Sequence, residues 1–260
     1  MSERTSGRIW TRDDTIFALA LYFQLPYGQL DARTPKVIEM ARLIGRSPAS
    51  LSMKMCNLAR LDPTLQNRQI SGLSHGAKFE LEIWNEFYHN QDKLADEFNR
   101  LISALTGHAS EMVAQDDLIK TPPGLDGMRL TKYRINQSFF RRSVLSAYDN
   151  RCCVTGINVP SLLIASHIKP WAKCEEGNEK TNAQNGLCLN ALHDKAFDKG
   201  FMTIDTNMCV RISPRLKNTM SVSAFNYHFG RYDGQRLIMP ERCPPDEKFL
   251  SFHRENVYVA

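Results

Sequence analysis

The sequence predicts an α+β protein in which an all-helical N-terminal module precedes a C-terminal domain of short strands and helices. Two observations predict this division. Apolar residues recur at helical spacing up to Leu105, whereas after residue 160 short apolar runs alternate with loops. Between them, Gly107 to Gly127 loses periodicity and contains Pro122-Pro123-Gly124. We therefore expect a helical module at 8–70, an acidic helical segment at 71–105, a linker at 106–130 and a C-terminal domain at 131–260.

The charge of the chain is distributed unevenly. The formal net charge is +5, with 42% apolar and 23% charged residues, which are ordinary globular values. Residues 1–70 carry 10 Lys and Arg against 6 Asp and Glu, residues 71–127 carry 4 against 10, and residues 128–260 carry 19 against 12. Two basic ends therefore flank an acidic middle. Basic surfaces attract the phosphate backbone of nucleic acids, although solvated charge without a partner is an equally simple reading.

The sequence also indicates the cellular compartment of the protein. The start of the chain is polar, so no signal peptide is expected, and no apolar run approaches the length that spans a bilayer. The seven cysteines are an odd number, which favours reduced thiols over a disulfide framework. We expect a cytoplasmic protein without a membrane partner. The cysteines lack the paired spacing of a structural zinc site, and buried free thiols are the better account.

Three helix starts are visible in residues 8–70. Thr11 can cap the first helix, with Asp13 and Asp14 in its first turn. The second helix starts at Thr34-Pro35, with Pro at the first helical position, and Ser47 and Pro48 are the cap and first residue of the third. The second helix stops at a glycine, and the short connection to the third is typical of a helix-turn-helix. This layout resembles Myb-like tri-helical DNA-binding modules.

That resemblance implies a third helix in the major groove of double-stranded DNA. Its outward residues would be Ser50, Lys54 and Asn57, and Arg46 would lie near a phosphate. The alternative is a small helical bundle that contacts only the next domain.

The acidic segment reads as one or two helices between Ser74 and Leu105, with an apolar face and an acidic face. We expect it to be structural. Acidic side chains disfavour contact with DNA, so this face would shield a neighbouring site or mediate a homodimer.

The stretch from Leu162 to Gly200 is predicted to form a strand, a long loop, a second strand and a short helix. It carries three motifs in order: Ser-His-Ile-x-Pro at 166–170, Asn-Gly-Leu-x-Leu at 185–189, and His-x-x-x-Phe-Asp-x-Gly at 193–200. In this combination the stretch resembles the HNH endonucleases, in particular bacterial restriction-type members. The resemblance implies a ββα-metal fold and a metal-dependent DNA endonuclease with a role in restriction or phage defence.

The resemblance assigns a role to three residues. His167 would remove a proton from the attacking water, because imidazole titrates near neutral pH. His193 would bind the divalent cation, and Asn185 would tie the long loop together and orient the base. Each residue alone has an ordinary reading, as a core histidine, a turn asparagine or a helix surface histidine. The three motifs in order are what favour a nuclease.

The expected metal is Mg²⁺ or Mn²⁺, with Zn²⁺ or Ni²⁺ left open. Many HNH enzymes place an acidic residue or a histidine directly before the base, where this chain has Ser166. Asp198 is the nearest substitute ligand, and a local capping role for it is equally consistent with helical geometry. Lys169 and Lys173 are expected phosphate contacts. The Cys-x-x-Cys zinc knuckle of many HNH proteins is absent, because Gly156 occupies the position of the second cysteine, three residues after Cys153.

Other functions remain open at this point. A homing, repair, RNA or toxin nuclease would share the same motifs, and a DNA-binding protein with a decayed HNH fold would keep the fold without activity. One HNH site cuts one strand, so double-strand cleavage would require a homodimer or repeated nicking.

Overall fold

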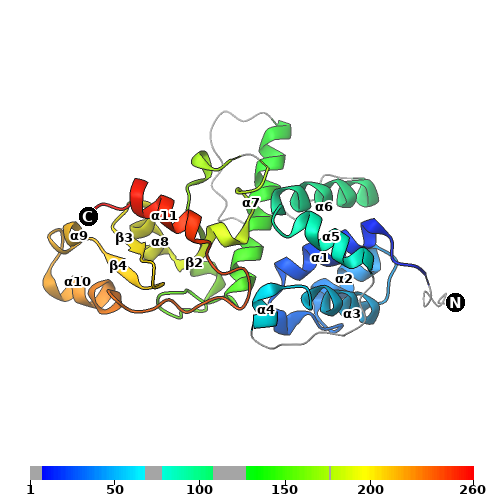
Figure 1. Ribbon diagram of the computed structural model, residues 1–260, viewed down its shortest axis with the longest axis horizontal. Helices are drawn as coiled ribbons and strands as arrows, with labels where there is room; N and C mark the ends of the chain where they lie inside the picture. Colours follow the sequence, from blue (N-terminus) through cyan, green and yellow to red (C-terminus); the bar gives the residue numbers. More distant parts are fainter. Residues whose placement is uncertain (1–7, 68–77, 108–126, 176) are drawn as a thin grey trace.

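The computed structural model describes residues 8–67, 78–107, 127–175 and 177–260 (Figure 1). Within these ranges the first half of the chain is helical. Its helices are α1 (Arg12–Gln24), α2 (Pro35–Leu43), α3 (Pro48–Ala59), α4 (Pro63–Asn67), α5 (Lys78–Phe87) and α6 (Gln91–Thr106). The predicted helix starts are confirmed at Thr11 and Ser47, whose hydroxyls accept hydrogen bonds from Asp14 N and Ser50 N. Gly45, with φ of 67°, lies in the turn between α2 and α3.

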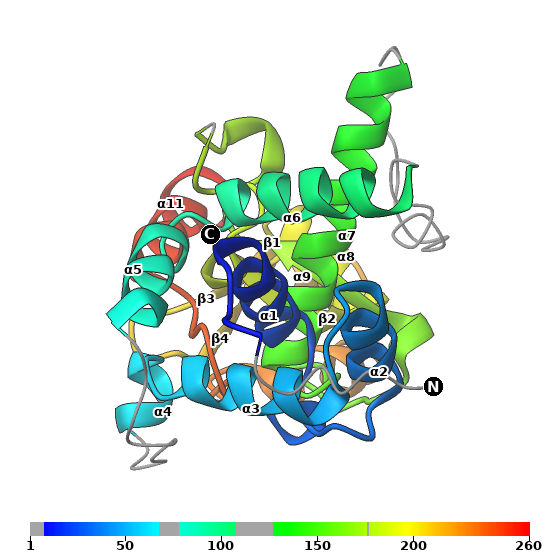
Figure 2. The same cartoon turned by 90° about the vertical axis from the view of Figure 1, so that its right-hand side faces the viewer.

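Helix α1 lies at the centre of the N-terminal half. It is buried continuously from Asp14 to Gln24, so it has no solvent face. It contacts α3, α5, α6 and α7 (Gly127–Ala147), which surround it in Figure 2. A helix that is apolar all round is stable only when neighbours cover every side. The other helices therefore pack around α1.

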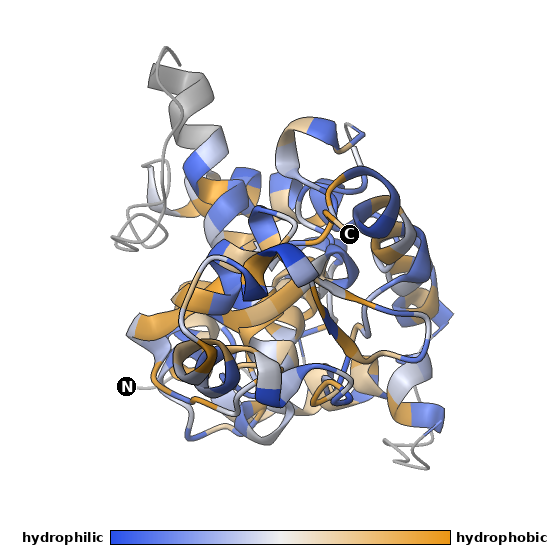
Figure 3. Ribbon diagram, turned by 90° about the vertical axis from the view of Figure 1, so that its left-hand side faces the viewer, coloured by the Kyte–Doolittle hydropathy of each residue, from blue (hydrophilic) through white to orange (hydrophobic). Residues whose placement is uncertain are grey.

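The C-terminal half contains two small antiparallel sheets and further helices. Strand β1 (Leu163–His167) pairs with β2 (Gly186–Asn190), and β3 (Met202–Ile204) pairs with β4 (Val210–Ile212). Every residue of β2 is buried. Figure 3 shows hydrophobic stretches of the ribbon gathered towards the centre of the view. The helices of this half are α8 (Ala191–Asp198), α9 (Pro214–Lys217), α10 (Val222–His228) and α11 (Glu247–Asn256). The predicted order of strand, loop, strand and helix is present in β1, β2 and α8.

Helix α7 belongs to the packing of both halves. It contacts α1 and α6 on one side and β1 and β2 on the other. Two polar side chains add three hydrogen bonds between the halves. Ser146 Oγ donates to Phe23 O, and Arg242 donates to Tyr22 O and Leu25 O, each at 2.5 Å. The helical half and the strand-containing half therefore share one buried core.

Some predictions fall on other parts of the chain. Most of the predicted linker, residues 108–126, and the expected helix start at Ser74 lie outside the described residues, as does the polar start of the chain. Residues 127–130, predicted as linker, are the first turn of α7. The domain boundaries themselves stay a prediction. All seven cysteines are free thiols. No helix in the described ranges is long and apolar enough to cross a membrane.

We expect Gly186→Ala to destabilise the fold. A Cβ at this position would lie 2.3 Å from Val144 Cγ2 and 3.0 Å from Phe140 Cζ, so α7 would have to move away from β2. Overpacking of this kind costs about 1–3 kcal/mol, measurable by denaturant unfolding. Gly28→Ala is the control, because nothing lies within 4 Å of its Cβ. Equal unfolding free energies for the two variants would show that α7 and β2 do not need this close contact.

Candidate functional site

The loop between β1 and β2 returns to the end of β1 and fixes the ring of His167. His167 is the last residue of β1, and its Nε2 lies 2.9 Å from Lys180 O. A carbonyl oxygen can only accept a hydrogen bond, so Nε2 carries the hydrogen. In the neutral ring, Nδ1 then holds the lone pair. The loop thereby selects the tautomer in which Nδ1 can accept a proton.

Aromatic packing keeps the His167 ring neutral. The ring stacks on Phe140 of α7 with centroids 3.7 Å apart, and Trp171 meets it edge-on at 5.4 Å. Burial against these rings lowers the pKa of His167 to about 4, although the hydrogen bond to Lys180 O acts in the opposite direction. His167 is therefore uncharged at neutral pH, which is the form that a general base requires.

Asn185 joins the two ends of the loop. Its side chain is fully buried, and its Oδ1 accepts a hydrogen bond from Lys169 N at 2.8 Å. Its Nδ2 donates to Glu179 O at 3.2 Å and to Lys169 O at 3.3 Å. One amide thus uses both donor and acceptor atoms to hold backbone groups ten residues apart. This geometry fixes the loop from the side of the strands.

The N-terminal half holds the same loop from the opposite side. Asp92, in the first turn of α6, accepts hydrogen bonds from Thr181 N at 2.6 Å and from the Thr181 hydroxyl. Gln91 accepts from Ala183 N at 3.0 Å. Both side chains are buried. The acidic segment therefore supports the residue next to Lys180, whose carbonyl orients His167. Sequence reasoning missed this role, because Asp92 looks like any acidic residue of a first helical turn.

His167 lines a cavity of about 480 Å³ between β1, α7 and α8. Ser166 and Trp171 line the same cavity on the β1 side, and Gln137 and Arg141 line it from α7. Four charged residues at the end of the motif complete it: Asp194, Lys195 and Asp198 of α8, and Lys199 directly after the helix.

Comparison with known proteins bears directly on this region. The family model described as HNH endonuclease matches residues 152–205, which contain β1, the loop, β2 and α8. Residues 152–205 form an HNH endonuclease domain. This match supports a nuclease activity for the chain.

Other comparisons add little. No curated protein matches the chain. Among solved structures, one titled "Modification dependent TagI restriction endonuclease" is similar over 45% of this chain and 37% of its own, with 21% identity and a TM-score of 0.31. The alignment thus spans little more than a third of that protein. At this identity and TM-score, the likeness carries no conclusion about substrate.

The HNH domain presents two carboxylates to the cavity. Asp194 and Asp198 are four residues apart on α8, and this spacing places both on one helix face. Both line the cavity that holds His167. Carboxylate oxygens are the ligands that Mg²⁺ and Mn²⁺ prefer, so this pair fits the divalent cation that the family implies. The described residues contain no cluster of three or more His, Cys, Asp or Glu that could hold a metal, so these two carboxylates would need water or phosphate as further ligands.

A histidine of α11 supports the end of α8. His253 Nε2 donates to Phe197 O at 3.1 Å, and its ring stacks on Phe197 with centroids 3.7 Å apart. Thr203 and His253 Nδ1 are 2.9 Å apart, so the ring is held on both sides. This contact fixes the turn of α8 that carries Asp198. Sequence reasoning missed this contact, because His253 lies 56 residues from Phe197.

His193 does not face this cavity. It is buried at the start of α8, with its Nδ1 3.1 Å from Asn190 Oδ1, and its ring packs against Phe229 and Tyr232. It lines a different hollow, together with Asn190 and Tyr232. His193 and His167 therefore line different hollows, and the role of His193 as a metal ligand stays a prediction. Successive helical residues point about 100° apart, so the carboxylate of Asp194 occupies the face that His193 does not.

Two of the residues expected to contact DNA are buried. The Arg46 guanidinium pairs with Asp14 at 2.7 Å and also donates to Arg8 O and Ile9 O. The Lys54 ammonium pairs with Glu80 of α5 at 2.5 Å, inside the fold. Lys54 is the only cation of α3, so the exposed face of that helix carries no positive charge. The expected outward position of Lys54 is thus corrected, and Arg46 is paired inside the fold where a phosphate contact was expected.

The remaining predicted contacts are partly accessible. Ser50 and Asn57 are half-buried on α3. Lys169 is paired with Glu179 at 2.6 Å within the long loop, and Lys173 is exposed on the same loop. Ser166 is buried, with no hydrogen-bond partner for its Oγ among the described residues. Their contacts with DNA stay predictions.

The titration of His167 should lie near pH 4. Its folded pKa is about 4 against an ordinary value of 6.5, so between these pH values the unfolded chain binds a proton that the folded chain does not. The folded state should therefore lose stability as pH falls from 6.5 towards 4. NMR titration of the His167 ring, assigned with the His167→Ala variant, measures this pKa. A midpoint near 6.5 would contradict the burial of the ring.

Asp92→Ala should lower cleavage without touching the cavity. The variant leaves Thr181 N without its acceptor, so the Lys180 carbonyl is no longer held in place. Asp92→Asn keeps one acceptor oxygen and should retain more activity. We expect kcat to fall more than KM changes, with the His167 pKa rising as the loop admits water. An unchanged kcat in both variants would mean that the loop holds His167 without α6. Asp96→Asn, on the same helix, is the control.

Proposed function

We propose that the chain is a metal-dependent endonuclease that hydrolyses phosphodiester bonds of DNA, with a role in restriction or phage defence. One observation carries the proposal. A histidine fixed as a neutral base shares a cavity with two carboxylates of one helix face, inside an HNH endonuclease domain. A base and an anionic cation site in one cavity are what phosphodiester hydrolysis requires.

His167 has the role of general base. Its Nδ1 accepts a proton from water, and the hydrogen bond from Nε2 to Lys180 O stabilises the imidazolium that results. Asn185 and Asp92 are positioning residues, because they act through the loop and not on the substrate. Burial opposes charge on the ring, so the proton must leave again before the next turnover.

Asp194 and Asp198 would hold the divalent cation. When bound, the cation supplies positive charge that offsets the negative charge on the scissile phosphate in the transition state. Arg141 adds a fixed positive charge to the cavity wall, because its guanidinium donates to Leu163 O at 2.7 Å. Lys195 on α8 and Lys199 directly after it are exposed, and they add charge that attracts the DNA backbone.

Plasmid cleavage tests the activity. Supercoiled plasmid is incubated with the protein in Mg²⁺, in Mn²⁺ or in EDTA, and nicked and linear products are measured. We expect cleavage with either metal and none in EDTA. His167→Ala should lower the rate by about 10²–10⁴-fold, the usual contribution of a general base. Cleavage that survives His167→Ala would refute the assigned base. Parallel digestion of modified phage DNA and unmodified plasmid tests the defence role.

The metal ligands are tested by substitution on α8. Asp194→Asn and Asp198→Asn should each weaken Mn²⁺ binding by at least about tenfold, since changes behind a metal ligand alone cost 10–100-fold. Titration calorimetry measures the binding without DNA. Asp149→Asn is the control, because Asp149 is exposed and its φ of 49° suits asparagine.

His193→Gln distinguishes the two assignments of the metal ligand. We expect it to retain Mn²⁺ binding if the protein stays folded, which thermal unfolding checks. Loss of Mn²⁺ binding in folded His193→Gln, with retention in both aspartate variants, would restore His193 as the ligand.

A further inference from the structure

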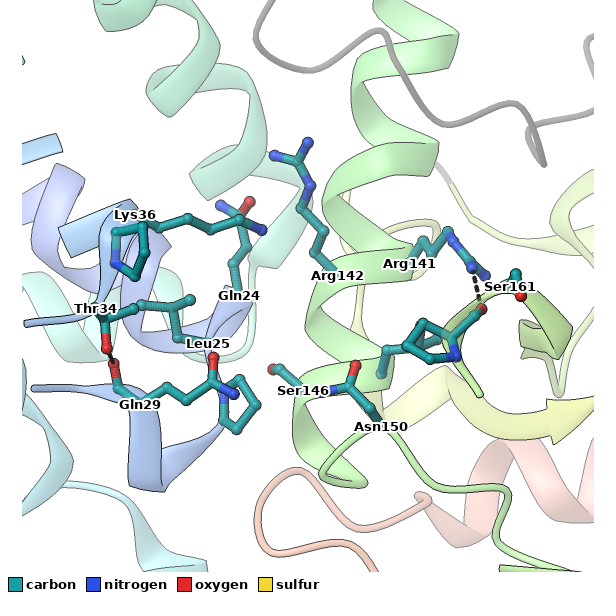
Figure 4. A pocket seen from close by; sticks show the side chains of 14 residues that line it. Gln24, Leu25, Gln29, Thr34, Lys36, Arg141, Arg142, Ser146, Asn150 and Ser161 are labelled. Carbon is teal, nitrogen blue, oxygen red and sulfur yellow. Dashed lines mark hydrogen bonds between the residues drawn. The ribbon is translucent and has the colours of Figure 1, made fainter. Parts of the chain in front are cut away.

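A second and larger cavity lies between α7 and the N-terminal helices. Its volume is about 780 Å³, within the range of roughly 300–1,000 Å³ that ligand sites occupy. Figure 4 shows Lys36 and Gln24 extending into it from the N-terminal helices, with Arg142 extending from α7 on the opposite side. The HNH motifs and the predicted DNA contacts include none of these residues.

The described residues that line this cavity carry positive charge and no negative charge. Three cations line it, Lys36, Arg141 and Arg142, and none of the described residues that line it is acidic. Amides and hydroxyls such as those of Gln29 and Asn150 supply hydrogen bonds. The positive charge indicates an anionic ligand with further polar groups.

The absence of aromatic side chains among the described lining residues restricts the class of ligand further. No described residue that lines this cavity is aromatic, and its floor is formed by aliphatic groups such as Leu25 and Leu145. Proteins that bind unpaired bases stack them on aromatic rings. A cavity with cations, amides and an aliphatic floor instead suits sugar and phosphate. The nucleic-acid backbone is the ligand class that satisfies both observations.

Arg141 connects this cavity with the active site. It lines both cavities, and its guanidinium is anchored to Leu163 O and Pro160 O. Along α7, Gln137 faces the active-site cavity and Leu145 faces the second one. Eight residues of helix span about 12 Å. This corresponds to the axial length of about three to four nucleotides of one DNA strand.

We propose that this cavity binds the sugar–phosphate backbone of the DNA strand a few nucleotides from the bond that is cut. The proposal rests on the proposed function, because the strand in question is the one in the HNH cavity. Lys36 and Arg142 contact phosphates, and Arg141 lies between the two cavities. Binding here uses the backbone and not the bases, so it is independent of sequence.

Binding by a cleavage-deficient protein tests the proposal. Full-length His167→Ala is titrated with a fluorescently labelled 20-base-pair duplex, and anisotropy is measured at several salt concentrations. In this background, Lys36→Ala/Arg142→Ala should weaken binding at least tenfold and reduce the slope of log K against log salt by about 1–2, since each lost phosphate contact contributes about 0.9. The control, Arg42→Ala/Lys217→Ala, removes the same charge from exposed positions outside the cavity and should change affinity less than twofold.

A second variant blocks the cavity without changing its charge. Ser161 is exposed at the cavity wall, so Ser161→Trp fills space there without disturbing the core. It should weaken duplex binding as the double variant does. Equal affinity losses in the cavity and control variants, or full binding by Ser161→Trp, would overturn the proposal. So would a free deoxynucleoside monophosphate that binds the cavity while duplex affinity is insensitive to all three cavity substitutions.

The same substitutions are then made in protein that keeps His167, and DNA cleavage is measured. This assay separates the proposal from the proposed function. Metal-dependent cleavage that is the same in cavity and control variants would sink the second site and leave the nuclease assignment intact. Cavity-dependent duplex binding without cleavage by the wild-type protein would support the second site and count against the assigned catalytic residues.

Discussion

The hydrogen bond from His167 to the Lys180 carbonyl is the interaction on which the site depends. It sets the tautomer of the base, and it exists only while the loop keeps that carbonyl in place. Asn185 holds the loop from the strands, and Asp92 holds the neighbouring Thr181 from α6. The orientation of one proton is thus determined by residues from both halves of the chain. Such outer contacts govern whether a correctly placed side chain is also correctly protonated.

Helix α7 brings these contacts together. Phe140 supplies the ring that desolvates His167, Arg141 lines the active-site cavity, and Val144 packs against Gly186. Arg142, directly after Arg141, and Leu145, directly after Val144, line the second cavity. A single rigid helix therefore fixes the distance between the catalytic base and the proposed backbone site, which loops could not do as reliably.

Sequence reasoning succeeded where the signal is local. Helix caps at Thr11 and Ser47 and the order of strands and helix around the HNH motifs are encoded within a few residues. It was wrong about Lys54, because the partner Glu80 lies 26 residues away and only the fold brings them together. The position of His193 outside the cavity of His167 was not predicted, for a different reason. A motif gives residue order, whereas the cavity is determined by rotation around α8, and a shift of one residue exchanges a histidine for Asp194.

Arg242 has a consequence for the order in which the fold is completed. Its buried guanidinium satisfies the carbonyls of Tyr22 and Leu25 at the end of α1, more than 200 residues earlier in the chain. During synthesis, α1 leaves the ribosome long before this partner does. The end of α1 therefore gains these hydrogen bonds only after Arg242 has been synthesised. The contact that joins the first helix to the strand-containing half is thus among the long-range contacts of the fold, which form only after the intervening chain is in place.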